Sequence, residues 1–430
     1  MSEPPRIAVV YERGAVTPAE IAVGLADLGT VLFAVPQSGS PHLALVQPLL
    51  QQLGEVVELT GDLETDLGRL RAHRPAAILT FSESRLRTAA RLAAGLRLSF
   101  HDIETVRLLT DKVQQRARLR EAGLDRVRCR GLCSAEEWPT ALAEIGLPAV
   151  VKPVQGEGSR NTLLVRSAEE AEQLLPLVFA GLDTTAWDEP VVVVEELLQG
   201  RPSGAFADYV SVESMCGPHG IAHFAVTGKF PLLPPFRETG IGFWPAAVGE
   251  GEQREILDLT TRALQALGVT LGLTHTEVKL TPDGPRIIEV NGRIGGQANL
   301  LYRHAHGVDL VRIAGLLALG ESVAPPDLRS DGQVHFLCSV VGPTQPCTYV
   351  AVHGEAEVRA LPGIAGYQLY TRPGERLAEG VMTRHLDAIW GRCADHEELT
   401  TLRRNALMAL SHEFDFPFGR RRVPATELMH

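Results

Sequence analysis

Two glutamates and an asparagine on either side of a predicted turn carry the clearest chemistry in this sequence. Glu277 and Glu289 lie equally far from Asp283 in a Pro-Asp-Gly turn, so a symmetric hairpin places them opposite one another. Opposed carboxylates with Cβ atoms about 5 Å apart repel each other, and a bound divalent cation removes that repulsion. Together with the amide of Asn291, these oxygen ligands suit Mg²⁺ or Mn²⁺ rather than zinc. The alternative is a solvated sheet face with chance acids, because a register slip of one residue separates the pair.

The same alternation assigns the neighbours of this hairpin to one face or the other. Arg293 follows Glu289 and Asn291 at the same spacing of two residues, so it is expected on the same face of the strand. We therefore expect its guanidinium just beyond the carboxylates. The opposite face is predicted to enter a core through Val278, Leu280, Ile288 and Val290.

A glycine-containing loop, residues 155–160, lies between two predicted strands. Gly156, Gly158 and Ser159 allow backbone amides to approach anionic oxygens closely, and Lys152 on the preceding strand is within reach of a phosphate. The loop is not a Walker motif, since G-x-x-x-x-G-K-[ST] is missing. An ordinary hairpin turn is the alternative for this segment.

An apolar strand, residues 191–198, ends in two acids. Four consecutive valines precede Glu195 and Glu196, and the main chain of such a strand can bind a flat base. Taken alone, the segment is equally consistent with a plain core strand.

The elements that must position these residues follow a regular order at the N-terminus. Strand and helix periods alternate over the first hundred residues, which predicts a parallel sheet with helices on its faces. No G-x-G-x-x-G follows the first strand, where Tyr11-Glu12-Arg13-Gly14 stands instead, so no NAD site is predicted.

Composition excludes several classes of protein. The 430 residues are 45% hydrophobic, enough for sizeable cores, and the net charge of −11 argues against broad nucleic-acid binding. No apolar run approaches the roughly 20 residues that span a bilayer. Six cysteines without a C-x-x-C pair indicate reduced thiols, so we expect a cytoplasmic protein. From the net charge and the short apolar runs, we expect no nucleic-acid or membrane partner.

In their order along the chain, these features resemble the ATP-grasp superfamily. Lys112, Lys152 with its glycine loop, the Glu195-Glu196 pair and the carboxylate hairpin follow one another as they do in that superfamily, over roughly residues 104–319. The most specific segment is Ile-Ile-Glu-Val-Asn-Gly-Arg-Ile-Gly-Gly at 287–296. Segments 226–229, 236–240, 361–364 and 372–375 are similar to the branch of carboxylate–amine ligases that join amino acids into dipeptides.

The resemblance implies an α/β (α+β) fold of ATP-grasp architecture in four parts. These are an N-terminal parallel-sheet domain (1–103), a central subdomain with the glycine-rich lid (104–190), a second subdomain with the metal site (191–320), and a C-terminal mixed-sheet domain (321–430).

The resemblance also implies a role for each motif. Glu277, Glu289 and Asn291 would hold Mg²⁺ or Mn²⁺, and Arg293 and Lys152 would be catalytic, Arg293 steadying an acyl phosphate or a substrate carboxylate. The residues assigned to ATP are Lys112, Lys152, Gly156, Gly158, Ser159, Glu195, Glu196, Leu198 and Asp208. Asp208 is the one expected to bind the ribose.

The implied activity joins a small-molecule carboxylate to an amine through an acyl phosphate, with release of ADP and phosphate. Two alternatives are another ATP-grasp enzyme, carboxylating or thioester-forming, and a nucleotide-binding scaffold without turnover. Gln297 stands where a bulky aromatic can narrow the acyl pocket, and Ile241 where a histidine often follows Thr-Gly, so the substrates stay open. A homodimer is the commonest assembly on general grounds.

Overall fold

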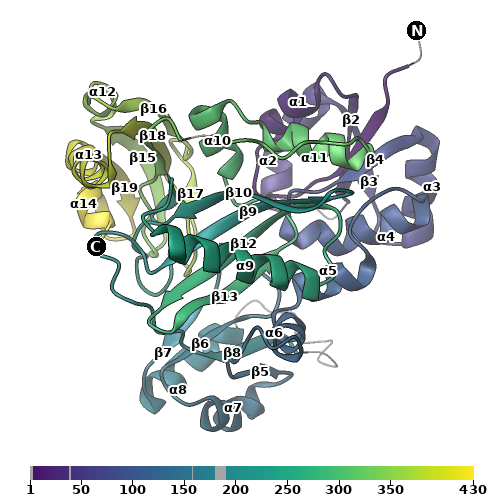
Figure 1. Ribbon diagram of the computed structural model, residues 1–430. Helices are drawn as coiled ribbons and strands as arrows, with labels where there is room; N and C mark the ends of the chain where they lie inside the picture. The colour runs from purple at the N-terminus through teal and green to yellow at the C-terminus, as the bar shows by residue number, and fades with distance from the viewer. Residues whose placement is uncertain (1–2, 38–39, 157, 180–189, 329) are drawn as a thin grey trace.

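The computed structural model describes residues 3–37, 40–156, 158–179, 190–328 and 330–430. Within these ranges the strands form four sheets, and Figure 1 shows a long central sheet with the other three arranged around it. The N-terminal part lies at one end of the central sheet, the C-terminal part at the other, and a small sheet lies beneath it.

The N-terminal sheet is parallel, as the alternation of strand and helix predicted. Its strands run in the order β3 (Glu55–Leu59), β2 (Thr30–Pro36), β1 (Arg6–Val10) and β4 (Pro75–Leu79). Helices α1 (Pro18–Leu25), α2 (Pro41–Leu53), α3 (Leu63–His73) and α4 (Leu86–Leu96) connect them. Both faces are covered, which explains the continuous apolar runs, since Ile7 and Val9 enter one core and Ala8 and Val10 another.

The central sheet is antiparallel and contains eight strands. Their order is β13 (Gly284–Asn291), β12 (Gly272–Thr281), β9 (Tyr209–Gly217), β10 (Gly220–Gly228), β11 (Gly240–Trp244), β14 (Val334–Cys338), β18 (Asp387–Cys393) and β16 (Ile364–Leu369). Helix α9 (Glu250–Ala266) covers one face, where Ile256 and Leu264 share a core with Val212, Val278 and Val290. On the opposite face, Met215 and Leu273 enter a second core, while Glu213, His275 and Glu277 provide polar side chains.

Helices join this central sheet to the N-terminal domain. Helix α5 (Ile103–Thr110) leads into α6 (Lys112–Glu121), while α10 (Ala298–His306) and α11 (Leu310–Ala318) follow β13. Gly24 of α1 lies so close to Val311 of α11 that a Cβ at Gly24 would be 2.7 Å from the valine side chain. This close approach places the carboxyl ends of the parallel strands beside the end of β13.

The small sheet beneath the central one has the strand order β5 (Cys129–Leu132), β8 (Val192–Glu196), β6 (Ala149–Pro153) and β7 (Leu163–Val165). Helices α7 (Trp138–Ile145) and α8 (Ala168–Phe179) contribute to its core, in which Trp138, Val151 and Val194 are buried. β8 pairs with both β5 and β6 and so belongs to the small sheet. The predicted domain boundary at 190/191 lies directly before β8 and would separate this strand from the rest of its sheet.

The C-terminal part builds a third antiparallel sheet, β17 (Arg376–Leu377), β15 (Cys347–His353), β19 (Ser411–Phe416) and β20 (Gly419–Pro424). Helices α12 (Glu355–Arg359), α13 (His396–Ala409) and α14 (Ala425–Leu428) complete it. Tyr349 and Phe414 share one core with Phe336 and Ile389 of the central sheet, so the two sheets pack together. Among the described helices, none has both the length and the apolar composition that crossing a membrane requires.

Candidate active site

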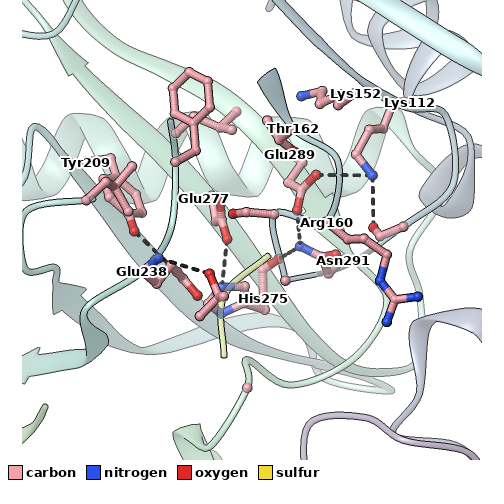
Figure 2. Close-up of a pocket in the computed structure, with 18 of the residues that line it drawn as sticks. Lys112, Lys152, Arg160, Thr162, Tyr209, Glu238, His275, Glu277, Glu289 and Asn291 are labelled. Atoms are coloured by element: carbon pink, nitrogen blue, oxygen red, sulfur yellow. Dashed lines mark hydrogen bonds and ion pairs between the residues drawn. The ribbon is translucent and has the colours of Figure 1, made fainter. Parts of the chain in front are cut away.

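A cavity of about 350 Å³ lies where all four parts of the chain meet. Figure 2 shows side chains from the central sheet, the small sheet and the glycine loop pointing into it. The N-terminal domain contributes Arg13 to its lining, and the C-terminal part contributes Thr383 and His385. Every site residue predicted from the sequence lines this cavity except Asp208.

The carboxylate hairpin has the predicted pair, reached by a different geometry. Glu277 of β12 lies directly opposite Glu289 of β13. The turn is not centred on Asp283, however, because Thr281 pairs with Gly284 across two turn residues. A β-bulge between Glu277 and Val278 restores the predicted pair. Val278 lies opposite Ile287 and Glu277 opposite Glu289, so Ile288 is the extra residue of the bulge. A regular two-residue hairpin would have placed Glu277 opposite Ile288.

The prediction for Ile288 was therefore wrong. Ile287, which is 2% exposed, enters the core beside Val278 and Val290, whereas Ile288 lines the cavity. The extra residue at the bulge changes which sheet face the residues between the bulge and the turn point to. The apolar side chain of Ile288 therefore lines the cavity, as do Val150 and Leu198.

The donor set at the hairpin fits a magnesium ion. Asn291 Nδ2 is 3.3 Å from Glu289 Oε1, and Lys112 Nζ is 3.5 Å from Glu289 Oε2. Burial opposes ionisation of Glu289, but the charges of Lys112 and Lys152 outweigh it and lower the pKa of this carboxyl to about 2. Among the described residues, no cluster of three or more His, Cys, Asp or Glu has metal-site geometry. Two carboxylates and an amide match Mg²⁺, which keeps phosphate and water oxygens as its other ligands.

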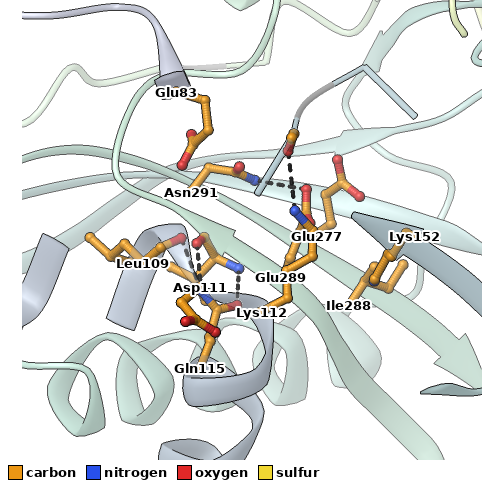
Figure 3. A network of polar contacts seen from close by, with 12 residues as sticks. Glu83, Leu109, Asp111, Lys112, Gln115, Lys152, Glu277, Ile288, Glu289 and Asn291 are labelled. Carbon is orange, nitrogen blue, oxygen red and sulfur yellow. Dashed lines mark hydrogen bonds and ion pairs between the residues drawn. The ribbon is translucent and has the colours of Figure 1, made fainter. Parts of the chain in front are cut away.

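Helix α6 holds Lys112 over this pair by binding the outer edge of β13. Asp111 caps the helix by accepting hydrogen bonds from the backbone N–H groups of Val113 and Gln114. One turn later, Gln115 donates to the carbonyl of Val290 at 2.9 Å and accepts from the Val290 N–H at 2.8 Å. Figure 3 shows Lys112 and Gln115 of this helix together with Glu289. Because β13 is an edge strand, these side-chain bonds replace a neighbouring strand and fix the helix on the metal-site strand.

Arg116 connects the edge of β13 to the small sheet. Its guanidinium donates to the carbonyls of Ile287 at 2.7 Å and Ile288 at 2.8 Å, and its Nε lies 3.0 Å from Glu195 Oε1. The other oxygen of Glu195 is 2.9 Å from Lys152 Nζ. Burial raises the pKa of Glu195, but the charges of Arg116 and Lys152 outweigh it and lower the pKa to about 2. The side chain of Glu195 therefore orients Lys152, and its backbone is paired within the sheet between β5 and β6.

Replacing Glu195 by glutamine is expected to lower the free energy of unfolding at neutral pH by about 2 kcal/mol, because charge-assisted hydrogen bonds to two buried cations are weakened. The folded pKa of about 2 lies below the ordinary value of 4.5, so the ionised carboxylate stabilises the fold above pH 4.5. That stabilisation is lost as the pH falls from 4.5 towards 2, and the variant should show a flatter acid profile. Urea unfolding at a series of pH values measures both effects.

Glu196→Gln is the matched control, because the Glu196 side chain is 29% exposed and pairs with the exposed Arg128 at 2.6 Å. Its effect should stay below about 1 kcal/mol. Parallel pH profiles for the wild type and Glu195→Gln would contradict the assignment.

The glycine loop contacts the C-terminal part of the chain. The N–H of Asn161 donates to the carbonyl of Val381 at 3.0 Å, and the N–H of Thr383 donates to the carbonyl of Gly158 at 3.1 Å. The Thr383 hydroxyl also accepts a hydrogen bond from the N–H of Glu238 at 2.9 Å. The segment 381–383 thus holds the loop against the cavity, a contact that sequence reasoning missed because no local pattern joins residues 220 positions apart.

The predicted adenine segment follows the end of β8. Leu197 and Leu198 line the cavity, and the N–H of Leu197 donates to the carbonyl of Pro148 at 3.3 Å. The predicted ribose ligand, Asp208, lies off the cavity lining, where its carboxylate is 2.6 Å from Lys279 Nζ. Lys279, rather than Asp208, lines the cavity on this side.

Arg293 lines the cavity at the end of β13 and is bound to the N-terminal domain. Its Nε is 3.1 Å from Glu83 Oε2, and both side chains are 9% exposed. Glu83 belongs to a short 3₁₀ turn, η1 (Glu83–Arg85), just beyond the carboxyl end of β4. Sequence reasoning missed Glu83, because its place beside Arg293 depends on the docking of two domains.

His275 lies between two acids on the same sheet face. Its Nδ1 contacts Glu213. Its Nε2 is 3.5 Å from Glu277 Oε1 (Figure 2). Burial lowers the pKa of His275, but the charge of Glu213 outweighs it and raises the pKa to about 9. The imidazolium therefore orients Glu277 from the side away from Glu289.

Lysine scarcity is the signal that could have found two further cavity residues. The chain has four lysines among its 41 lysines and arginines, namely Lys112, Lys152, Lys229 and Lys279. All four line this cavity. Lys229 ends the segment 226–229 and Lys279 lies on the strand of Glu277, but the sequence motifs assign neither of them a role.

Known proteins are similar to this chain in sequence and in fold. No family model matches the chain. An uncharacterised protein of Sinorhizobium fredii, y4rH, is 29% identical over 70% of this chain and 60% of its own length. The alanine–anticapsin ligase of Bacillus subtilis is 25% identical over 61% of this chain and 58% of its own length. The chain thus spans about three fifths of the length of these curated relatives.

A solved structure, the L-amino acid ligase from Bacillus licheniformis, superimposes with a TM-score of 0.74. The match covers 95% of this chain and 98% of that one at 20% sequence identity. The fold implied by the sequence resemblance is therefore confirmed.

Proposed function

We propose, from the ATP-grasp fold that the chain has, that it is an ATP-dependent carboxylate–amine ligase forming an amide bond with release of ADP and phosphate. The observation that carries this proposal is the opposed pair of Glu277 and Glu289 beside Lys112 and Lys152 in one cavity. The ligases among the relatives support the class of reaction. The substrates we propose are a small carboxylic acid and an amine, at least one of them an amino acid.

ATP fits the part of the cavity between the two sheets. The apolar side chains of Val150, Leu198 and Ile288 suit a flat base, and the backbone after Glu196 offers hydrogen-bonding groups to its edge. Lys112 and Lys152 suit the phosphates, as do the backbone amides of the glycine loop. A magnesium ion held by Glu277, Glu289 and Asn291 would neutralise phosphate charge.

The residues of this chain then favour transfer of the γ-phosphoryl group to the substrate carboxylate. A carboxylate oxygen attacks the γ-phosphorus, the bond from that phosphorus to the bridging oxygen breaks, and ADP leaves. Lys152 and Arg293 stabilise the charge that develops on the transferred group. The neutral amine attacks the acyl carbon of the resulting acyl phosphate, and phosphate leaves.

Water must be kept from the acyl phosphate, because hydrolysis would waste ATP. The glycine loop is the proposed lid, and its hydrogen bonds to Val381 and Thr383 support a closed position. The C-terminal part of the chain is therefore proposed to take part in lid closure.

The products test the mechanism. With pairs of amino acids as substrates, the enzyme is expected to release one ADP and one phosphate for each amide formed, detected by coupled assay and by mass spectrometry of the condensation product. AMP and pyrophosphate as stoichiometric products would refute an acyl phosphate. ADP release that depends on bicarbonate would instead identify a carboxylating enzyme.

A further inference from the structure

Lys229 is a buried lysine whose ammonium group has no partner among the residues that the structure describes. It directly follows β10, is 4% exposed and lines the cavity. The other three lysines are each paired with an acid, Lys112 with Glu289, Lys152 with Glu195 and Lys279 with Asp208. For Lys229, no hydrogen bond or ion pair of the side chain exists within the part of the chain that the structure describes.

The Lys229 ammonium faces the cavity rather than an acid of the described chain, so this position suits an anion supplied from outside. Acids on the same side of the cavity have other partners. Glu238 accepts a hydrogen bond from the hydroxyl of Tyr209 at 3.2 Å, and Glu213 contacts His275.

Strand register places Lys229 relative to the carboxylate pair. Thr227 of β10 lies opposite Ser211 of β9, which lies opposite Glu277 of β12. Lys229 is two residues beyond Thr227 and so lies on the same face, displaced by two strands from Glu277. Two strand spacings amount to about 10 Å between backbones. Helix α6 and Lys112, by contrast, lie at the outer edge of β13, on the far side of the carboxylate pair.

Lys229 therefore lies on the opposite side of the carboxylate pair from Lys112. In an amide formed from two amino acids, the acyl half loses its carboxylate in the bond, and the free carboxylate belongs to the amine half. We propose that Lys229 binds the carboxylate of the amine substrate, so that this substrate is an amino acid rather than a simple amine. This inference rests on the proposed ligase function.

The test compares an amino acid with its α-carboxamide as the amine substrate, at a fixed acid substrate taken from the product screen. The wild type should prefer the free carboxylate by about 10–100-fold in kcat/KM, because one charge-assisted hydrogen bond is lost with the carboxamide. In Lys229→Met this preference should fall to within about twofold, mainly through a higher KM for the amino acid. Lys229→Arg should restore part of it.

Lys279→Met is the matched control. This variant also removes a lysine ammonium from the same sheet face, but the ammonium of Lys279 is paired with Asp208 at 2.6 Å. This variant should keep the preference for carboxylate over carboxamide, whatever its effect on ATP binding. An unchanged preference in Lys229→Met would overturn the inference. So would a loss of more than tenfold in ADP release with the acid substrate alone, which would make the anion a phosphoryl group.

Binding measured by calorimetry, with ADP and Mg²⁺ present, separates this inference from the proposed reaction. The wild type should bind the amino acid more tightly than its carboxamide, and Lys229→Met should bind both alike. Such discrimination in an enzyme that makes no amide would remove the ligase proposal and keep the carboxylate site. Equal binding of both compounds by the wild type would overturn the site itself.

Discussion

Replacing Glu289 by glutamine is expected to abolish ligation, a loss of about 10³-fold or more, while the fold is retained. The amide has the same shape as the carboxylate but no charge, so it weakens the ligand set that we propose for Mg²⁺. It also removes the ion pair with Lys112, whose Nζ is 3.5 Å from Glu289 Oε2. The two effects together remove charge neutralisation where phosphoryl transfer needs it.

Rates of ADP and amide formation measure the loss, and circular dichroism with urea unfolding checks the fold. Glu255→Gln, on the exposed side of α9, is the control and should retain the wild-type rate. Activity should also require Mg²⁺, with Mn²⁺ as a substitute. Ligation in the presence of excess chelator would contradict the metal site.

Replacing Arg293 by alanine is expected to lower the ligation rate by roughly 10²–10³-fold, with ATP·Mg binding nearly unchanged. Its guanidinium lines the cavity next to the carboxylate hairpin, where negative charge develops on the transferred phosphoryl group. Arg293→Lys keeps the charge but loses the forked geometry, so its loss should be smaller. Steady-state kinetics and a separate titration of ATP·Mg distinguish rate from binding.

The ion pair between Arg293 and Glu83 supplies the control for a purely structural role. If Arg293 served only to bind the N-terminal domain, Glu83→Gln would reduce the rate as much as Arg293→Ala does. We expect Glu83→Gln to cost about tenfold or less, because the guanidinium stays in the cavity. A near wild-type rate for Arg293→Ala would show that the assignment at this end of β13 is wrong.

How far the sequence predicts this molecule depends on the range of the interactions involved. Alternation of strands and helices in the first hundred residues predicts the parallel sheet, because each element carries its own period. The pairing of Glu277 with Glu289 was also predicted, yet for a symmetric turn that does not exist. The bulge at Ile288 that produces the pair lies beside edge contacts with Gln115 and Arg116, which have no local signature in the sequence.

Contacts between distant segments were out of reach for the same reason. Glu83 meets Arg293, and Thr383 meets Gly158, only because separate domains dock around the cavity. Lys229 and Lys279 are different, since residue counts alone single them out in a chain with four lysines. The other side chains among the lysines and arginines are arginines, which keep their charge. The lysines, by contrast, all line the cavity.

The confinement of lysine to one cavity also gives this protein an unusual chemical selectivity. Acylating reagents react with neutral amines, and guanidinium groups stay protonated and inert towards them. The side chains of this chain that can be acylated in this way all line the cavity, so acylation would report on access to the candidate active site rather than on the outer surface. The same property makes side-chain amine coupling a poor means of attaching the protein to a support, because the bonds would form where the substrates have to enter.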